Sequence, residues 1–288
     1  MAVGKITKGR IVFIVINTTL LILLAVVTLY PFLYVTAASF SDRMFILRGD
    51  IGIIPKGFNV NAYKNVFKYH LLWRSYGNTI FYVILGTSIN MLLTVLGAYP
   101  LSRKQFKGRR FFSFMLVFTM WFNAGMIPTF LVVRGMGLYN TFWALVLPNA
   151  ISTYNLIVVR TFFDNIPAEM EEAALIDGGN DFQVLMKVIL PLSVPVLMTI
   201  TLFYLVGHWN AFMPALLYLR SEELYPLQMI LRKIVLQSLV DEENLEDQVL
   251  AESVKYSTIV VATVPILCVY PFIQRYFVTG VMIGAVKG

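Results

Sequence analysis

Charged residues and cysteines are scarce in this sequence of 288 residues. Asp, Glu, Lys and Arg make up 14% of the chain and hydrophobic residues 58%, whereas a soluble domain contains roughly 25% charged residues. This composition excludes a soluble protein, because the chain cannot cover a surface that faces water. The single cysteine, Cys268, excludes an intrachain disulfide and gives no indication of the redox compartment.

Motifs for catalysis are also missing. The sequence has no G-x-x-x-x-G-K-[ST] loop for phosphates, only two histidines, no His/Cys/Asp cluster with metal-ligand spacing and no Ser in a nucleophile motif. We therefore predict that the chain is not an enzyme and binds no metal or other cofactor itself. Its net charge of +7 does not predict nucleic-acid binding, because most Lys and Arg residues flank apolar runs, as they do beside membrane spans.

Long apolar runs are what the sequence has in abundance. Six of them are rich in Leu, Val, Ile and Phe and have no ionised side chain at their centres: residues 11–37, 78–101, 111–133, 141–162, 192–219 and 256–277. Each has the about 20 residues that a helix needs to cross a bilayer, and all are too uniformly apolar for the alternating strands of a membrane barrel. We predict an all-α integral membrane protein with six transmembrane helices, in a single domain over residues 1–288.

The first run has a second interpretation as a signal peptide. Val35-Thr36-Ala37 loosely resembles a cleavage site. However, the run is much longer than the roughly 7–15 residues of a signal-peptide core. We therefore expect an uncleaved helix.

The short loops predict the orientation. Residues 102–110 contain five positive side chains, whereas residues 135–140 carry no charge. Positive loops stay in the cytoplasm, so both termini and the loop 163–191 are expected there, and segments 38–77 and 220–255 face outward. The second outer segment contains an acidic group, including Asp241, Glu242 and Glu243, which fits either a solvated helical loop or a binding surface for an extracytoplasmic partner.

The loop 163–191 has the signals of two short helices. Pro167 suits a first helical turn, and Gly178 can end the helix in a left-handed conformation. Asn180, with Gln183 three residues later, marks the start of the second helix. Three acidic residues near the start of the first helix suit the positive end of its dipole: Glu169, Glu171 and Glu172.

One face of the first helix carries Met170, Ala173 and Ala174 at helical spacing. Small Ala side chains allow close backbone approach, and Met adapts to an irregular groove. Taken alone, these residues fit docking into another protein and simple packing within the loop equally well.

The same loop resembles the EAA loop of ABC-importer permeases. Glu172-Ala173-Ala174, three residues, Gly178, nine residues and Val188-Ile189-Leu190-Pro191 match its pattern of EAA, G and I-x-L-P, with Val188 in place of Ile as the one departure. The resemblance implies that the first helix is a coupling helix that sits in a groove of an ATP-binding subunit. The coupling residues that it implies are Glu169, Met170, Glu172, Ala173, Ala174, Asp177 and Gly178.

Other stretches extend the resemblance over essentially the whole chain. Residues 191–195, the pair Trp209-Asn210 and the stretches 274–280 and 284–288 are similar to the maltose-type permeases of carbohydrate uptake. Residues 127–130 and 140–145 are similar to permeases for alginate- and pectin-type oligosaccharides. The resemblance implies a type I ABC importer permease fold and one half of a heterodimeric path for oligosaccharides, uronate-rich ones among them. Transport would proceed by ATP-driven alternating access.

The resemblance also implies the partners at a bacterial cytoplasmic (inner) membrane. They are membrane lipid, a second permease subunit, an extracytoplasmic substrate-binding protein and two ATP-binding subunits that supply ATP hydrolysis with Mg²⁺. The tail residues Gly284, Ala285 and Lys287 would lie between the two ATP-binding subunits. Two alternatives stay open: an importer for another solute, such as polyamines, phosphate or glycerol phosphate, and a membrane scaffold without transport.

Polar residues inside apolar runs are costly in lipid and are therefore candidates for function. Hydrogen bonds between helices explain many such amides equally well. His208, Trp209 and Asn210 are candidates for a sugar path, because an aromatic face stacks on a sugar ring while amide and imidazole groups bond hydroxyls. Tyr154 and Asn155 on the neighbouring span are further candidates. The full set of polar residues in the runs is Asn90, Asn123, Asn149, Asn155, His208 and Asn210.

Overall fold

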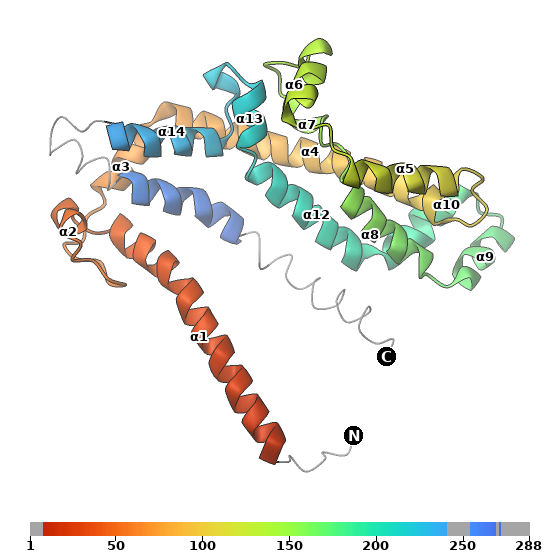
Figure 1. Cartoon of the computed structure of the whole chain (residues 1–288), viewed down its shortest axis with the longest axis horizontal. Helices are drawn as coiled ribbons and strands as arrows, with labels where there is room; N and C mark the ends of the chain where they lie inside the picture. Colours follow the sequence, from red (N-terminus) through yellow and green to blue (C-terminus); the bar gives the residue numbers. More distant parts are fainter. Residues whose placement is uncertain (1–7, 241–253, 269–270, 272–288) are drawn as a thin grey trace. The chain divides into compact units, whose positions relative to one another are not determined.

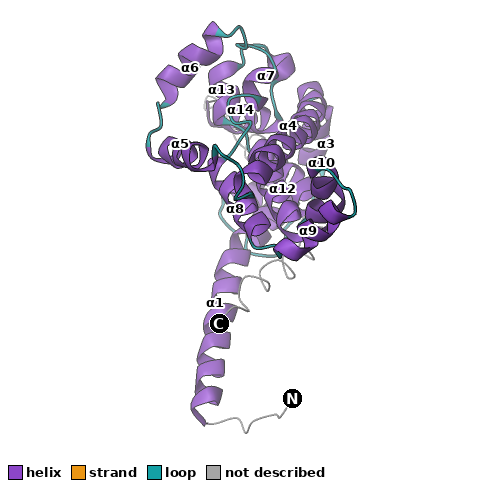
Figure 2. Cartoon of the chain, turned by 90° about the vertical axis from the view of Figure 1, so that its right-hand side faces the viewer, coloured by secondary structure: helices purple, strands orange, loops and turns teal. Residues whose placement is uncertain are grey.

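The computed structural model describes residues 8–240, 254–268 and 271, and all regular structure among these residues is helical (Figure 1). Figure 2 shows helices and loops, and no strand in the described part of the chain. The predicted all-α class is therefore confirmed. The predicted acidic group at 241–252 and the tail residues Gly284, Ala285 and Lys287 lie outside the described residues.

The chain divides into two compact units, residues 1–69 with 231–263 and residues 70–230 with 264–288. The first unit begins with α1 (Lys8–Ser39), whose 32 residues extend about 48 Å at 1.5 Å per residue. Its apolar side chains are exposed up to Leu33, Tyr34 is half-buried, and Ala37 and Ala38 are buried against Ile46 and Ile51. The short helices α2 (Arg43–Leu47) and α3 (Asn61–Lys68) follow. Consecutive apolar residues are exposed all around α1, and a helix that is apolar on every side fits a membrane span.

The second unit is built around α4 (His70–Ser102), which packs against α8 (Thr153–Asp164) and α12 (Val194–Trp209). Ala98, Val159 and Ile200 are fully buried in this contact. Glycines on α4 bring the helices together: a Cβ atom at position 97 would lie 2.9 Å from Cδ1 of Leu156. Small residues at such crossings are typical of helix packing in membranes.

The predicted run 111–133 is two helices rather than one. α5 (Arg109–Trp121) and α6 (Met126–Gly135) are bent by 117°. Gly125 has a φ of +84°, which lies in the left-handed region that favours glycine. Asn123 Oδ1 accepts the Gly125 N–H at 2.8 Å, as in an Asx turn. Asn123 is therefore a turn residue of this bend.

Two other predicted runs are interrupted as well. In the run 141–162, α7 (Trp143–Val146) ends before Pro148, and α8 begins at Thr153. In the run 192–219, α12 ends at Trp209 and α13 (Met213–Tyr218) follows, with Pro214 in its first turn. Proline lacks the N–H that a continuing helix needs. At membrane depth, non-helical backbone is tolerated where protein surrounds it or where it lines a wet cavity, so these breaks indicate where a cavity could lie.

The loop after α8 contains α9 (Ala168–Ile176), α10 (Asp181–Val184), the π-helical turn η1 (Leu185–Ile189) and α11 (Leu190–Leu192). The segment Asp181–Leu192 is bent by 83° against α12. Pro191 and Pro195 lie on either side of this bend, and each removes one backbone donor.

A short 3-10 turn, η2 (Glu222–Leu224), lies against the first turns of α4. Arg74 forms an ion pair with Glu223 at 3.0 Å, and Asn78 Nδ2 donates to the Glu223 carbonyl at 2.7 Å. Thr79 Oγ1 accepts the backbone N–H of Leu227 at 2.8 Å, at the start of α14 (Leu227–Val240). These contacts hold the first turns of α4, which starts at His70 rather than at the predicted residue 78.

By length and composition, α1 and α4 can each cross a membrane. The two bent pairs, α5 with α6 and Asp181–Leu192 with α12, would raise the number of spans among the described residues to four. The helix Val254–Cys268 overlaps the first part of the last predicted run, 256–277, and is apolar but shorter.

Candidate functional site

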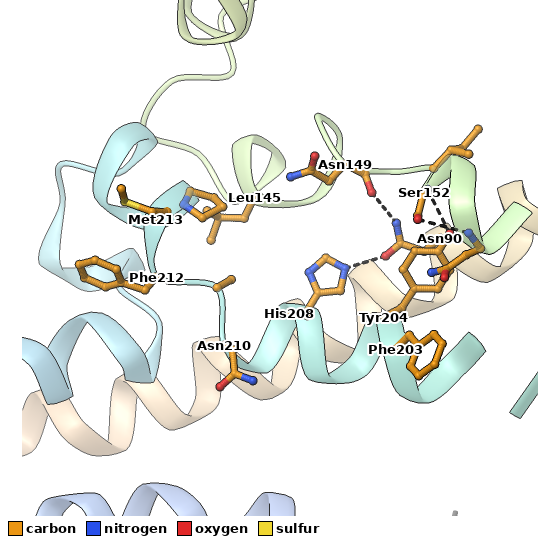
Figure 3. A pocket seen from close by; sticks show the side chains of 15 residues that line it. Asn90, Leu145, Asn149, Ser152, Phe203, Tyr204, His208, Asn210, Phe212 and Met213 are labelled. Carbon is orange, nitrogen blue, oxygen red and sulfur yellow. Dashed lines mark hydrogen bonds between the residues drawn. The ribbon is translucent and has the colours of Figure 1, made fainter. Parts of the chain in front are cut away.

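A cavity of about 680 Å³ lies in the second unit, between α4, the break from α7 to α8 and the end of α12 (Figure 3). None of the described residues that line this cavity is Lys, Arg, Asp or Glu. Phe203, Phe212 and Met213 supply apolar surface. The polar groups of the lining are amides, hydroxyls and one imidazole: Asn90, Asn149, Asn155, Asn210, Ser152, Tyr204 and His208.

Asn90 is the centre of the polar wall. It is fully buried on α4, and its Nδ2 donates to the backbone carbonyls of Asn149 at 2.9 Å and Ala150 at 2.7 Å. Its Oδ1 lies 2.6 Å from His208 Nε2, and Figure 3 shows the imidazole turned toward this amide. Because Oδ1 can only accept, Nε2 must carry the proton in this arrangement. One side chain thus satisfies two carbonyls of the break and orients the histidine.

Tyr204 makes a parallel connection from α12. Its hydroxyl lies 2.7 Å from Thr94 Oγ1 on α4 and accepts the Ser152 N–H at 3.1 Å. Ser152 in turn caps α8, since its Oγ accepts the Asn155 N–H at 3.4 Å. Buried polar groups need such partners, and the non-helical segment before α8 therefore receives them from both neighbouring helices.

The candidates for the sugar path divide into two groups. His208, Asn155 and Asn210 line the cavity, although in Figure 3 the Asn210 side chain points away from Asn90. Trp209 is 7% exposed and does not belong to the lining, and Tyr154 is 59% exposed and faces elsewhere. Asn90 and Asn149 could be identified from the sequence as polar residues inside apolar runs. Nothing in the sequence singled out Ser152 or Tyr204.

The predicted coupling loop, residues 163–191, contains the expected turn between two helices. Pro167 is the N-cap of α9, and Gly178, with a φ of +82°, follows the helix. The Gly178 N–H donates to the Leu175 carbonyl at 3.0 Å. Asn180 and Gln183 form the predicted capping box at the start of α10. The local signals for the helix end and the second helix start are thus confirmed.

Most of the predicted coupling residues point outward. Glu169, Met170, Glu172, Ala173 and Asp177 are exposed. Ala174, in contrast, is half-buried and packs against the core formed by α4, α8 and α12. Three further apolar side chains that the sequence reasoning did not single out are also exposed around this turn: Leu175, Ile176 (86% exposed) and Phe182.

Ion pairs connect the ends of the helices at this side of the unit. Arg103, directly after α4, pairs with Glu171 of α9. Arg109 donates to both carboxylate oxygens of Asp164 at the end of α8, at 3.1 and 3.0 Å. Arg160 lies 3.7 Å from the same carboxylate.

In residues 8–240 and 254–268, no group of three or more His, Cys, Asp or Glu side chains is placed so that it could hold a metal ion.

Comparison with known proteins shows consistent similarities. Residues 94–283 match the family described as "Binding-protein-dependent transport system inner membrane component". The chain is 42% identical over 273 residues to the polygalacturonan/rhamnogalacturonan transport system permease protein YtcP of Bacillus subtilis (strain 168), covering 93% of this chain and 96% of that protein. It is 43% identical to Protein LplC of the same organism, covering 98% and 97%.

A solved structure is similar over nearly the same length. The crystal structure of a bacterial ABC transporter involved in the import of the acidic polysaccharide alginate contains a chain with 39% sequence identity and a TM-score of 0.87. The alignment covers 94% of this chain and 98% of that one.

Proposed function

The chain belongs to the family of binding-protein-dependent transport system inner membrane components, and from this premise we propose that it forms one half of the path of an oligosaccharide importer. Members of the family are membrane-embedded permease components and not enzymes themselves. The chain has the type I importer permease fold, as its similarity to the alginate transporter chain shows. Transport through it would need a second permease, two ATP-binding subunits and a substrate-binding protein.

The cavity beside Asn90 and His208 is the observation that carries the proposal. Its volume of about 680 Å³ lies in the range of ligand sites, roughly 300–1,000 Å³. Amide, hydroxyl and imidazole groups can both donate to and accept from sugar hydroxyls, and Phe203 and Phe212 offer ring faces for stacking. We propose that the second permease provides the opposite wall.

Uronate-rich oligosaccharides are the proposed substrates, because two similar proteins are named for polygalacturonan and alginate transport. The described lining has no cationic side chain, so this subunit would bind sugar hydroxyls, and carboxylates would find their partners elsewhere in the path. The test is uptake of galacturonate oligosaccharides into proteoliposomes that hold the four-subunit importer and its binding protein. Neutral malto-oligosaccharides serve as the control. Uptake of polyamine or phosphate instead, with none of either sugar, would contradict the proposal.

Energy would enter through α9. Met170, Leu175 and Ile176 are exposed apolar side chains on a loop that should face the cytoplasm, and such patches mark protein contacts. Exposed Ala173 lets a partner approach closely, whereas half-buried Ala174 attaches the helix to its own core. We propose that this face docks into the ATP-binding subunit and that its movement tilts the attached helices between outward and inward access.

Copurification of the ATP-binding subunits tests this docking. Ala173→Glu should weaken their association by about tenfold or more, because a charge would be buried without a partner. Gly178→Val should do the same, since a β-branched residue disfavours the φ of +82°. Ala173→Ser is the matched control and should keep the association. Normal association of both disruptive variants, at equal membrane abundance, would remove the coupling role of α9.

Two regions outside the described residues carry further proposals. We propose that the acidic group contacts the substrate-binding protein, so that replacing Asp241, Glu242 and Glu243 by amides lowers stimulation by that protein but leaves basal ATP hydrolysis unchanged. We also propose that the tail reaches the ATP-binding subunits, so that deletion of 284–288 reduces transport but not assembly. Unchanged stimulation in the first case, or normal transport in the second, would contradict them.

A further inference from the structure

The ion pair between Arg103 and Glu171 joins two elements that are far apart in sequence. Arg103 follows the last residue of α4, and Glu171 lies in α9. The two side chains are only 21% and 19% exposed. The Arg103 guanidinium also lies 4.8 Å from the centre of the Tyr99 ring, an arrangement that favours a cation over an aromatic face. The Arg103–Glu171 pair is therefore a largely buried, multiply supported contact and not a chance contact at the surface.

Glu171 differs from the other acidic residues near it in α9. Glu169 and Glu172 are exposed, whereas Glu171 is turned into its own subunit. Within the described residues, Nε and Nη2 of Arg103 have no hydrogen-bond partner. Glu171 therefore supplies most of the negative charge that balances the Arg103 guanidinium. Removal of one member of such a pair leaves a largely buried charge uncompensated, which is costly.

α4 connects this corner to the cavity. It is continuous over 33 residues, and Asn90 lies about 20 Å along the helix from Arg103 at 1.5 Å per residue. The same helix carries Thr94, which bonds Tyr204. The other route from α9 to the cavity runs through the π-helical turn η1 and the 83° bend before α12. Pro100 lies on this stretch of α4 and removes one backbone hydrogen bond near the end of the helix. α4 nevertheless continues through it to Ser102, so it is the more continuous of the two connections.

Resting on the proposed coupling role of α9, we propose that the Arg103–Glu171 pair is a second mechanical link between α9 and the cavity. When α9 moves with the ATP-binding subunit, the pair makes α4 move with it. Asn90 and Thr94 then shift against the break before α8 and against α12, and the cavity wall changes. Arg103 and Glu171 are positioning residues in this scheme, because neither touches the cavity.

Four variants separate this link from general charge effects. Arg103→Glu and Glu171→Arg each break the pair. The double variant, which carries both substitutions, restores an ion pair with the two charges exchanged. Lys104→Glu is the matched control, because it makes the same charge change at the neighbouring exposed residue. All variants carry Cys268→Ser and Ala211→Cys, so that the one cysteine of this chain lies in the cavity lining.

The experiment uses the importer assembled with its second permease and ATP-binding subunits. It measures how fast a hydrophilic maleimide labels Ala211→Cys with and without ATP plus vanadate, together with copurification of the ATP-binding subunits. In the background and in Lys104→Glu we expect nucleotide to change the labelling rate. In each single variant this change should shrink by about fivefold or more, while copurification stays normal, and the double variant should restore the change.

Each other result overturns the link. A single variant that responds to nucleotide like the background shows that α4 does not need the pair. Failure of the double variant to restore the response shows that the two charges do not act together. Loss of copurification in the single variants shows that the pair shapes the docking surface instead of transmitting its movement. If the background itself fails to bind ATP-binding subunits, the coupling role of α9 fails first, and this link fails with it.

Discussion

At the scale of single residues, Gly86 determines whether the polar wall of the cavity can form. A Cβ atom at this position would lie 2.4 Å from Nε2 of His208. That nitrogen is the one placed 2.6 Å from Asn90 Oδ1. An added methyl group would therefore displace the imidazole and break its bond to Asn90, whose amide also holds the carbonyls of the break before α8.

Gly86→Ala should lower the melting temperature of the purified importer and reduce uptake, with a loss of about 1–3 kcal/mol from overpacking. This direction is opposite to the helix propensity of alanine, which favours it over glycine by roughly 0.5–1 kcal/mol. Gly77→Ala is the matched control on the same helix, because its Cβ would meet nothing within 4 Å. Thermal unfolding followed by intrinsic fluorescence measures both. Equal melting temperatures for the two variants would show that the contact between position 86 and His208 does not affect stability.

The sequence could indicate some of these residues but not others. His208, Asn155 and Asn210 stand out because a polar group in an apolar run is rare. Gly86 and Tyr204 are ordinary in membrane helices, and their roles depend on which helices cross at which residue. Trp209 was attractive by chemistry alone, but its position on α12 turns it away from the cavity.

At the scale of elements, the break between α7 and α8 is one of the three interruptions of predicted runs that hydropathy could not predict. Averaged over a window, residues 141–162 are apolar enough to cross a membrane, but Pro148 and the amides around it leave backbone groups without helical partners. Side chains from α4 and α12 supply them. Long continuous helices such as α1 and α4 could be predicted, because their apolar runs contain no such interruption at the centre.

Tyr204→Phe tests how strongly the break depends on side chains. The change removes one hydroxyl and leaves Thr94 Oγ1 and the Ser152 N–H without their partner, at a cost of about 1–3 kcal/mol for a buried group. We expect a lower melting temperature and weaker uptake. Tyr154→Phe removes the same atom from an exposed side chain and should change neither. If uptake falls only in Tyr154→Phe, Tyr154 rather than Tyr204 would belong to the sugar path.

At the scale of the whole molecule, the coupling scheme requires that α9 and the positive loop lie on the same side of the membrane. Arg103 and Glu171 are in contact, so α9 must lie on the side of the loop 103–109. Lys104 and Lys107 are exposed in this loop. At the far end of α4, Arg74 is paired with Glu223. The difference in exposed positive charge favours the loop end in the cytoplasm, where ATP-binding subunits would be found.

Cysteine labelling tests this orientation directly, because Cys268 is the single cysteine and Cys268→Ser gives a cysteine-free background. Lys104→Cys places a thiol in the positive loop, and Met136→Cys places one after α6, at a side chain that is 66% exposed. In intact spheroplasts, a membrane-impermeant maleimide should label Met136→Cys and leave Lys104→Cys unlabelled. After permeabilisation both should react, which controls for local accessibility. The reverse pattern in intact spheroplasts would put α9 outside the cell, away from ATP, and docking of α9 to ATP-binding subunits would be excluded together with the link through Arg103 and Glu171.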